Sequence, residues 1–286
     1  MNAYSCHAKG PTQLSIANPA AVSVIYGSHS KTSKGPWYSI TELRASLHTA
    51  RDKQEHKVRQ KVWDKAFKAS PLKDYKHRVS RYSHQLIYVI QQNLDRPIDM
   101  AKWFNYFAFD VMGDLAFGKS FNMLIDDKDS YFESQLHGDM KMVDLFSHLT
   151  WLFPFVKRTP FLNKDYLKFW QWLEDQVTER VQRYGFSASL KTFNVDLEGK
   201  DEQVFVRGEE FLPERWTTAP ELIKDPSVFI AFGGGIYACV GKQLALMELR
   251  QVVAEVLVRY EVSFAPGQTA DAFQNDINCE STEGTR

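Results

Sequence analysis

The chain has few cysteines, and their spacing does not suit a shared site. Only three occur in 286 residues, namely Cys6, Cys239 and Cys279, and none of them forms a C-x-x-C pair. A disulfide framework needs an even set of cysteines, and a zinc site needs closely spaced ligands. The sequence therefore argues against both, and each cysteine has to be considered on its own.

The sequence also lacks recognisable segments for export or membrane insertion. Residues 1–27 show no basic start followed by an apolar run, so we predict no signal peptide. No stretch approaches the ~20 apolar residues that span a bilayer. The chain has no permitted N-x-S/T glycosylation acceptor either. Taken alone, these absences predict a soluble, cytoplasmic chain without a membrane span.

An excess of charge of either sign is absent as well. The 35 Lys and Arg residues balance 35 Asp and Glu residues, so the formal net charge is zero. Nucleic-acid-binding domains usually carry a basic excess, so no nucleic-acid partner is expected. The length allows one large domain or two small ones. We predict a single domain over residues 1–264, followed by a polar and disordered tail, 265–286.

The hydrophobic pattern predicts a mainly α fold with few strands. Apolar residues recur at three- and four-residue steps, which is typical of amphipathic helices. One short apolar stretch, 14–16, predicts a strand. On the helix near residue 60 the predicted apolar side carries Val58, Val62, Ala66 and Phe67, and on the last helix it carries Ala245, Leu249, Val252, Val256 and Tyr260. The predicted helices span 20–26, 51–69, 72–94, 99–117, 131–149, 164–184 and 242–260.

The most informative segment is a glycine-rich loop with a cysteine near its end. Residues 232–241 read FGGGIYACVG and lead directly into the last predicted helix. Consecutive glycines let a flat ligand approach the main chain. A cysteine at a helix N-terminus lies near unpaired N–H groups that stabilise its thiolate. The segment therefore predicts a soft metal ligand at Cys239, with a buried structural cysteine as the alternative.

This loop resembles the haem-binding motif F-x-x-G-x-x-x-C-x-G of the cytochrome P-450 superfamily. The fixed positions fall on Phe232, Gly235, Cys239 and Gly241. The resemblance implies that Cys239 is the axial ligand of haem iron. It also implies that Phe232 packs near the thiolate and that the two glycines let the loop fold beneath the haem. Tyr237 stands where many members have His or Arg and would donate a hydrogen bond to a haem propionate.

Other segments resemble the same family, and the resemblance covers roughly residues 14–184 and 203–264. Residues 46–67 resemble the third helix of fungal members, which runs along the propionates. His56 stands there at an aromatic position and Gln60 at the usual arginine, so the neighbouring Arg59 is the predicted propionate contact. Residues 102–121 resemble the fifth helix. The overall pattern is closest to fungal members of secondary metabolism.

Residues 211–216, FLPERW, resemble the F-x-P-E-R-[FW] motif that precedes the haem loop. The resemblance implies that Arg215 pairs with the Glu and Arg of an upstream E-x-x-R helix. No E-x-x-R occurs before Phe211, and no [AG]-G-x-[DE]-T oxygen-activating helix occurs at all. Only about twenty residues, between Arg183 and Gln203, occupy the place of these elements. We therefore expect a partial cytochrome P-450 fold without them and without the N-terminal anchor.

The resemblance implies a haem-thiolate monooxygenase, which inserts one oxygen atom of O₂ into a small organic substrate. The cofactor would be haem b, and electrons would come from NADPH through NADPH–cytochrome P-450 reductase or a similar donor. Typical fungal members reside at the endoplasmic reticulum membrane. The alternative is a truncated, non-catalytic remnant or an incomplete gene model with weak or no haem binding.

One further motif points to another class of protein. Residues 113–120, GDLAFGKS, satisfy the phosphate-binding pattern G-x-x-x-x-G-K-[ST]. A genuine P-loop follows a buried strand and opens a helix. Here the motif follows a helical pattern, and Gly118 suits a helix C-cap. We predict the end of a helix at this position and no nucleotide site.

Overall fold

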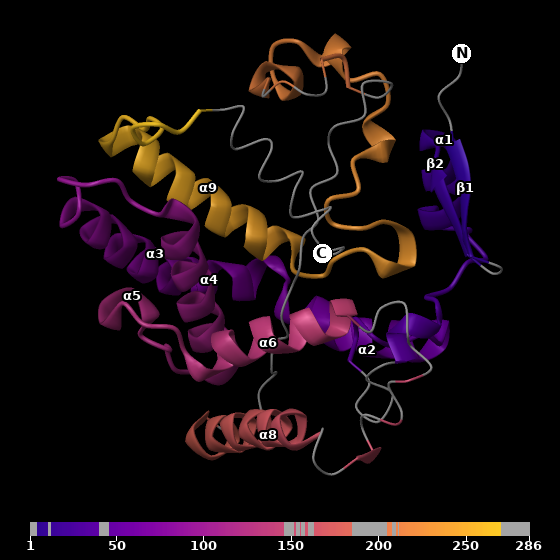
Figure 1. Cartoon of the computed structure of the whole chain (residues 1–286), viewed down its shortest axis with the longest axis horizontal. Helices are drawn as coiled ribbons and strands as arrows, with labels where there is room; N and C mark the ends of the chain where they lie inside the picture. Colours follow the sequence, from indigo (N-terminus) through magenta and orange to yellow (C-terminus); the bar gives the residue numbers. More distant parts are fainter. Residues whose placement is uncertain are drawn as a thin grey trace.

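The computed structural model describes residues 5–10, 13–39, 46–145, 152, 155, 158–159, 163–184, 205–207, 210 and 212–269. Over these residues the chain is mainly helical with few strands, as predicted, and its two strands form one hairpin (Figure 1). No described helix has the length and apolar character needed to cross a membrane. The elements are β1 (Ser5–Gly10), β2 (Gln13–Ala17), α1 (Pro19–Tyr26), α2 (Lys53–Ala66), α3 (Ala69–Gln91), α4 (Met100–Phe117), α5 (Met123–Asp126), α6 (Tyr131–Leu145), α8 (Lys164–Tyr184), the 3₁₀ turns η2 (Pro213–Trp216), η3 (Pro220–Leu222), η4 (Pro226–Val228) and η5 (Gly235–Tyr237), and α9 (Lys242–Arg259).

Local capping explains why most predicted helix boundaries are confirmed to within a few residues. Asn18, Asp52 and Asp99 each accept a backbone N–H bond at the start of α1, α2 and α4. Such caps satisfy donors that the first helical turn leaves unpaired. At the other end of α4, Gly118 adopts a left-handed φ of 74° and donates its N–H to the carbonyl of Asp114 at 2.9 Å. Most of these boundaries are therefore encoded within a few residues of sequence.

The core lies where α3 packs against α4 and α9, which run beside one another in Figure 1. Trp103, Phe107, Val111 and Leu115 recur at four-residue steps along α4, and all four side chains are buried. Burial of such side chains is the main stabilising contribution, about 1.5–3 kcal/mol for each large one. The buried apolar residues of the three helices include Val79, Tyr82, Leu86, Trp103, Phe107, Val111, Leu115, Val252 and Val256.

A buried polar clasp fixes how α9 lies on α3. Ser83 is 1% exposed, and its hydroxyl donates to Glu255 Oε1 at 3.0 Å. Gln251 Nε2 donates to the same hydroxyl at 2.9 Å. These directional bonds specify one register between the two helices, which apolar packing alone does less strictly. Because α9 begins immediately after the glycine-rich loop, the clasp also positions that loop.

The apolar side predicted for α2 is wrong in its first half. Val58 and Val62 are 65% and 58% exposed. The helix packs instead through a stripe made of His56, Trp63 and Phe67, of which His56 and Phe67 are buried. Both stripes have helical spacing, and the position of the neighbouring elements selects between them.

The side predicted for α9 is also wrong at Leu249, which is 57% exposed. The contact between α9 and α3 centres on Val252 and Val256. Leu249 precedes them by three and seven residues and so lies on the same side of the helix, which means that the position of the neighbouring elements, and not the helical spacing, leaves it exposed. Two short elements were not predicted at all, namely the strand β1 and the single turn α5. The first pairs with β2 in an antiparallel register, in which Ser5 lies opposite Ala17.

Candidate functional site

The glycine-rich loop folds back on itself before α9 begins. Gly233 and Gly235 adopt left-handed φ angles of 64° and 57°, which favour glycine because it has no side chain. The N–H of Gly233 donates to the carbonyl of Ile230 at 2.7 Å. The N–H of Cys239 donates to the carbonyl of Phe232 at 2.8 Å. The second bond closes the loop, so the two ends of the predicted motif lie side by side.

Cys239 is a free, half-buried thiol directly before α9. Burial raises the pKa of this thiol, while the backbone N–H groups of Gly241 and Lys242 and the Lys242 ammonium act in the opposite direction. The stabilisation predicted from the helix N-terminus is therefore present, but desolvation outweighs it. Without a metal the thiol is protonated at neutral pH, so binding a metal ion would release a proton.

Gly235 allows a close approach by the end of α1. A Cβ at this position would lie 2.2 Å from the carbonyl oxygen of Tyr26 and 3.1 Å from that of Gly27. Any side chain would therefore force the end of α1 away from the loop. The glycine had been predicted to admit a haem, and its described neighbour on this side is the main chain of α1.

Tyr237 forms the centre of a polar cluster on the N-terminal side of the loop. Its ring lies edge-on to the buried His56, with 4.8 Å between ring centroids. Its hydroxyl donates to the carbonyl of Arg51 at 3.5 Å. Lys34 places its Nζ 4.6 Å from the centroid of the Tyr237 ring. The structure thus brings together the two aromatic positions, 56 and 237, that were predicted to face a propionate edge.

Arg59 lies one turn further along α2. Its guanidinium pairs with Glu55 at 2.6 Å, and the side chains are 39% and 44% exposed. The propionate contact predicted for Arg59 stays a prediction. Neither Lys34 nor His48 was predicted to belong to this cluster. Lys34 lies in a segment, 27–37, that carries no motif and is notable only for its lysines, and His48 lies in the stretch 46–67, where the family resemblance indicates positions 56, 59 and 60 instead.

Arg215 is buried, with 7% of its surface exposed, beneath the η2 turn. Its Nη2 donates to the carbonyls of Arg207 at 2.8 Å and Val206 at 3.1 Å. Its Nε has no hydrogen-bond partner. Among the described residues no carboxylate forms an ion pair with it. Backbone carbonyls therefore hold the cation where the family resemblance implies a glutamate; Phe211, which opens the same motif, lies outside the described residues.

The phosphate-binding pattern at residues 113–120 lies on the end of α4, as predicted. Lys119 pairs with Glu179 of α8 at 2.5 Å. The hydroxyl of Ser120 donates to Asp110 at 2.9 Å. The two side chains that would bind phosphate and metal in a P-loop are thus engaged within the fold, and the segment ends a helix instead of opening one.

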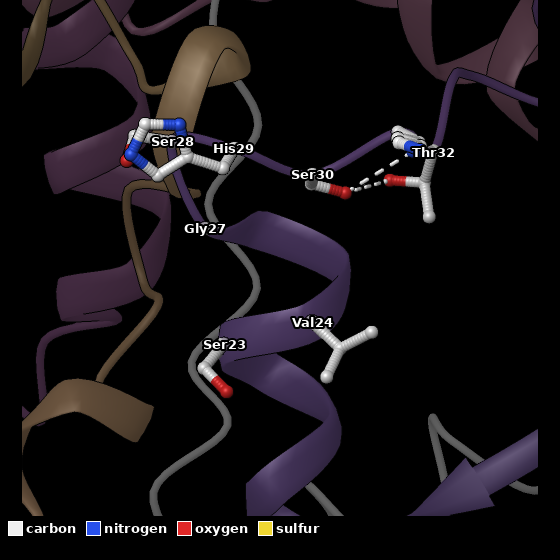
Figure 2. Close-up of a pocket in the computed structure, with 8 residues that line it drawn as sticks. Ser23, Val24, Gly27, Ser28, His29, Ser30 and Thr32 are labelled. Atoms are coloured by element: carbon white, nitrogen blue, oxygen red, sulfur yellow. Dashed lines mark hydrogen bonds between the residues drawn. The ribbon is translucent and has the colours of Figure 1, made fainter.

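The donor at Cys239 has the chemistry that a haem iron requires of an axial ligand. A thiol at a helix N-terminus, with two N–H groups directed at its sulfur, is a suitable donor for a soft metal. A cavity of about 690 Å³ lies elsewhere, at the C-terminal end of α1, where it is lined by Ser23, Val24 and the loop 27–32 (Figure 2). A second space of only about 10 Å³ touches the loop at Gly234 and Tyr237. Cys239 lines neither of them, so the case for a haem here rests on the chemistry of the thiol and not on the shape of a cavity.

Comparison with known proteins identifies the family. The model of the Cytochrome P-450 family matches residues 2–188 and 192–280. The cytochrome P-450 monooxygenase orf5 of Eupenicillium brefeldianum is 30% identical over 381 aligned positions, with 92% of this chain and 78% of the relative covered. The monooxygenase FCK2 of Fusarium pseudograminearum is 31% identical, with 92% and 70% covered. Tryprostatin B 6-hydroxylase of Neosartorya fischeri is 23% identical, with 91% and 70% covered.

The same comparison shows that the chain is shorter than its relatives over the region that they share. The alignment with the Eupenicillium relative has 381 positions and the chain has 286 residues, so at least 95 positions of the alignment have no counterpart here. The family match is interrupted at residues 189–191. This point falls inside the stretch 183–203, where the sequence is too short for the E-x-x-R and oxygen-activating helices. With a family match over most of its length and monooxygenases among its relatives, the chain belongs to the cytochrome P-450 family of enzymes.

Proposed function

We propose that this chain is a haem-thiolate monooxygenase in which Cys239 ligates the iron of haem b. The observation that supports this most is the closed loop before α9, where the Cys239 thiol meets two backbone N–H groups. The reaction is the insertion of one oxygen atom of O₂ into an organic substrate. Electrons come from NADPH through NADPH–cytochrome P-450 reductase or a similar donor.

The residues of the loop would divide the work of holding the cofactor. The Cys239 thiolate would hold the iron, and a thiolate-bound haem would supply oxygen activation, because the sulfur donates electron density that favours O–O cleavage. Phe232, whose carbonyl accepts the N–H of Cys239 at 2.8 Å, would pack near the sulfur. The N–H groups of Gly241 and Lys242 would stabilise the charge on the sulfur. Tyr237 and His56, which lie edge to face, would contact the carboxylates of the cofactor.

The names of the relatives support a proposal for the substrate class. One of them is named for the 6-hydroxylation of tryprostatin B, and several are fungal monooxygenases. We propose a small organic molecule of fungal secondary metabolism as the substrate.

A second candidate is a haem-binding remnant without catalytic activity. Two observations favour it. At least 95 aligned positions of a relative are missing, and Arg215 has no carboxylate partner among the described residues. Without a helix to enclose the oxygen site, water would enter, and the control of the reaction that a closed site provides would be lost.

Turnover under defined conditions separates the candidates. The full chain is expressed with haem supplied, purified, and given reductase, NADPH and O₂ with a panel of aromatic and peptide-like substrates. We expect haem that is lost on gel filtration and product formed with poor coupling to NADPH use. Product at the level of a Cys239→Ser control would establish the remnant. One product molecule for each NADPH would show that other residues replace the missing helices.

A further inference from the structure

A row of apolar side chains is exposed along α9, beside the buried Val252 and Val256 that contact α3. Leu249, Val253 and Leu257 are 57%, 46% and 63% exposed, and they follow one another at four-residue steps. Since about 3.6 residues complete one helical turn, each step rotates the row by only about 40°. The three side chains therefore form one continuous surface, the α9 stripe. Isolated apolar residues are common on protein surfaces, whereas a contiguous group of them marks an interaction site.

The two ends of the α9 stripe carry opposite charges. Arg250 lies three residues before Val253, and Glu261 lies four residues after Leu257, just beyond the end of α9. Both charged side chains are exposed, and neither forms an ion pair within the described part of the chain. The stripe thus has an apolar centre, a cation toward its start and an anion toward its end. Such a surface is complementary to a copy of itself that runs in the opposite direction.

Two properties of the whole chain favour a second copy as the partner. The chain has no counterpart for at least 95 positions of its alignment with the Eupenicillium relative, so it has fewer residues with which to cover apolar surface. Its formal net charge is zero, so two copies do not repel one another strongly at neutral pH. A different protein would need a matching stripe with the opposite order of charges, whereas a second copy already carries it.

We propose that two copies of this chain pair through their α9 stripes in an antiparallel arrangement with two-fold symmetry. Val253 of each copy packs against Leu257 of the other, and Arg250 of each lies beside Glu261 of the other. A parallel pairing would bring like charges together, so the charges select the direction. A two-fold interface uses the same surface of both copies, and the assembly therefore closes at the dimer. This inference goes beyond the proposed function and does not rest on haem binding.

Sedimentation equilibrium of the full chain, over about a hundredfold range of concentration, measures the assembly. We expect a reversible equilibrium between monomer and dimer, because one helix from each copy makes an interface at the small end of the specific class. Val253→Asp places like charges in the apolar centre and should raise the dissociation constant at least about a hundredfold. The control is Val58→Asp, which adds the same charge at a 65% exposed valine of α2 and should leave the dissociation constant unchanged.

An exchange of charges tests the direction of pairing. Arg250→Glu should raise the dissociation constant about tenfold, because the symmetric interface contains this contact twice. Adding Glu261→Arg to Arg250→Glu should restore most of the affinity. Because both positions are exposed, this series decides the question even if Val253→Asp does not fold.

Several results would overturn the proposal. A chain that stays monomeric at every concentration would do so, as would a dimer that persists in Val253→Asp or an equal loss in Val58→Asp. Growth beyond the dimer would contradict a closed two-fold interface. If the double charge exchange does not recover the affinity, the antiparallel pairing is wrong. None of these readouts requires bound haem, so a failure of the proposed function and a failure of this pairing are distinguished.

Discussion

Replacing Arg215 by methionine tests whether its buried charge has lost its partner. Nη2 carries two hydrogens, which serve the carbonyls of Val206 and Arg207. Two bonds from a charged donor contribute about 3–6 kcal/mol together. The desolvation of an ion without an opposite charge costs several kcal/mol. The two effects nearly cancel, so we expect Arg215→Met to change the free energy of unfolding by less than about 2 kcal/mol, in either direction.

Arg78 provides the matched control. It pairs with Asp114, with Nη2 2.7 Å and Nε 2.8 Å from the two carboxylate oxygens, and Asp114 is only 7% exposed. Arg78→Met strands that carboxylate, for which Arg81 at 3.4 Å compensates only in part. We expect a loss of about 3 kcal/mol, near the lower end of the range for breaking a buried pair.

The assay is urea unfolding followed by circular dichroism, with the slope compared among variants to confirm that the same transition is measured. We expect Arg215→Met to leave the free energy of unfolding nearly unchanged and Arg78→Met to lower it strongly. If Arg215→Met is as destabilising as Arg78→Met, Arg215 has a carboxylate partner after all, and the account of a missing E-x-x-R helix is wrong.

Three further changes have defined outcomes. Titration with ATP or GTP and Mg²⁺ by calorimetry should give no specific heat at residues 113–120, and micromolar binding that Lys119→Ala abolishes would contradict the helix assignment. Asp110 is 1% exposed and accepts hydrogen bonds from the N–H groups of Met123 and Leu124. Asp110→Ala should therefore lower the free energy of unfolding, measured in urea, by about 3–5 kcal/mol. A loss under about 1 kcal/mol would show that water replaces the carboxylate as the acceptor for these N–H groups. Burial raises the pKa of Glu248 to about 7, so its contribution to stability is full below about pH 4.5 and is lost as pH rises through 7. Glu248→Gln should therefore be more stable than wild type at pH 8 by about 1–2 kcal/mol, which is less than the full pKa shift would give because the side chain is partly exposed. If the free energy of unfolding of Glu248→Gln falls as steeply between pH 4.5 and 7 as that of wild type, this prediction is refuted.

Local features of the sequence were sufficient for the helices but not for their orientation. The ends of α4 follow from Asp99 and Gly118, which act through bonds within one turn. The face of α9 depends on where α3 lies, and that of α2 depends on the loop that brings Tyr237 to His56. Neither helix encodes these positions in its own residues. Two stripes of helical spacing occur on α2, and only the tertiary contacts select the one that contains His56.

In the candidate site, too, the part that is contiguous in sequence could be predicted and the part that depends on long-range packing could not. The spacing around Cys239 indicated the thiol ligand, because the loop and the start of α9 are contiguous. The cluster around Tyr237 could not be predicted, since Lys34 and His48 come from a separate part of the chain about 200 residues earlier. The approach of Tyr26 to Gly235 also depends on that long-range packing. Cys279 and all of the predicted tail, 265–286, except residues 265–269 lie outside the described residues, and of Cys6 only the main chain is described.

The central claim is that Cys239 alone supplies the thiolate to haem iron. The most direct measurement is the absorbance spectrum of the haem-loaded chain after reduction and addition of carbon monoxide, recorded for three serine variants. We predict that Cys239→Ser abolishes the strongly red-shifted band of a thiolate-ligated haem, whereas Cys6→Ser and Cys279→Ser retain it. Retention of that band in Cys239→Ser, or its loss in either of the other variants, would contradict the assignment.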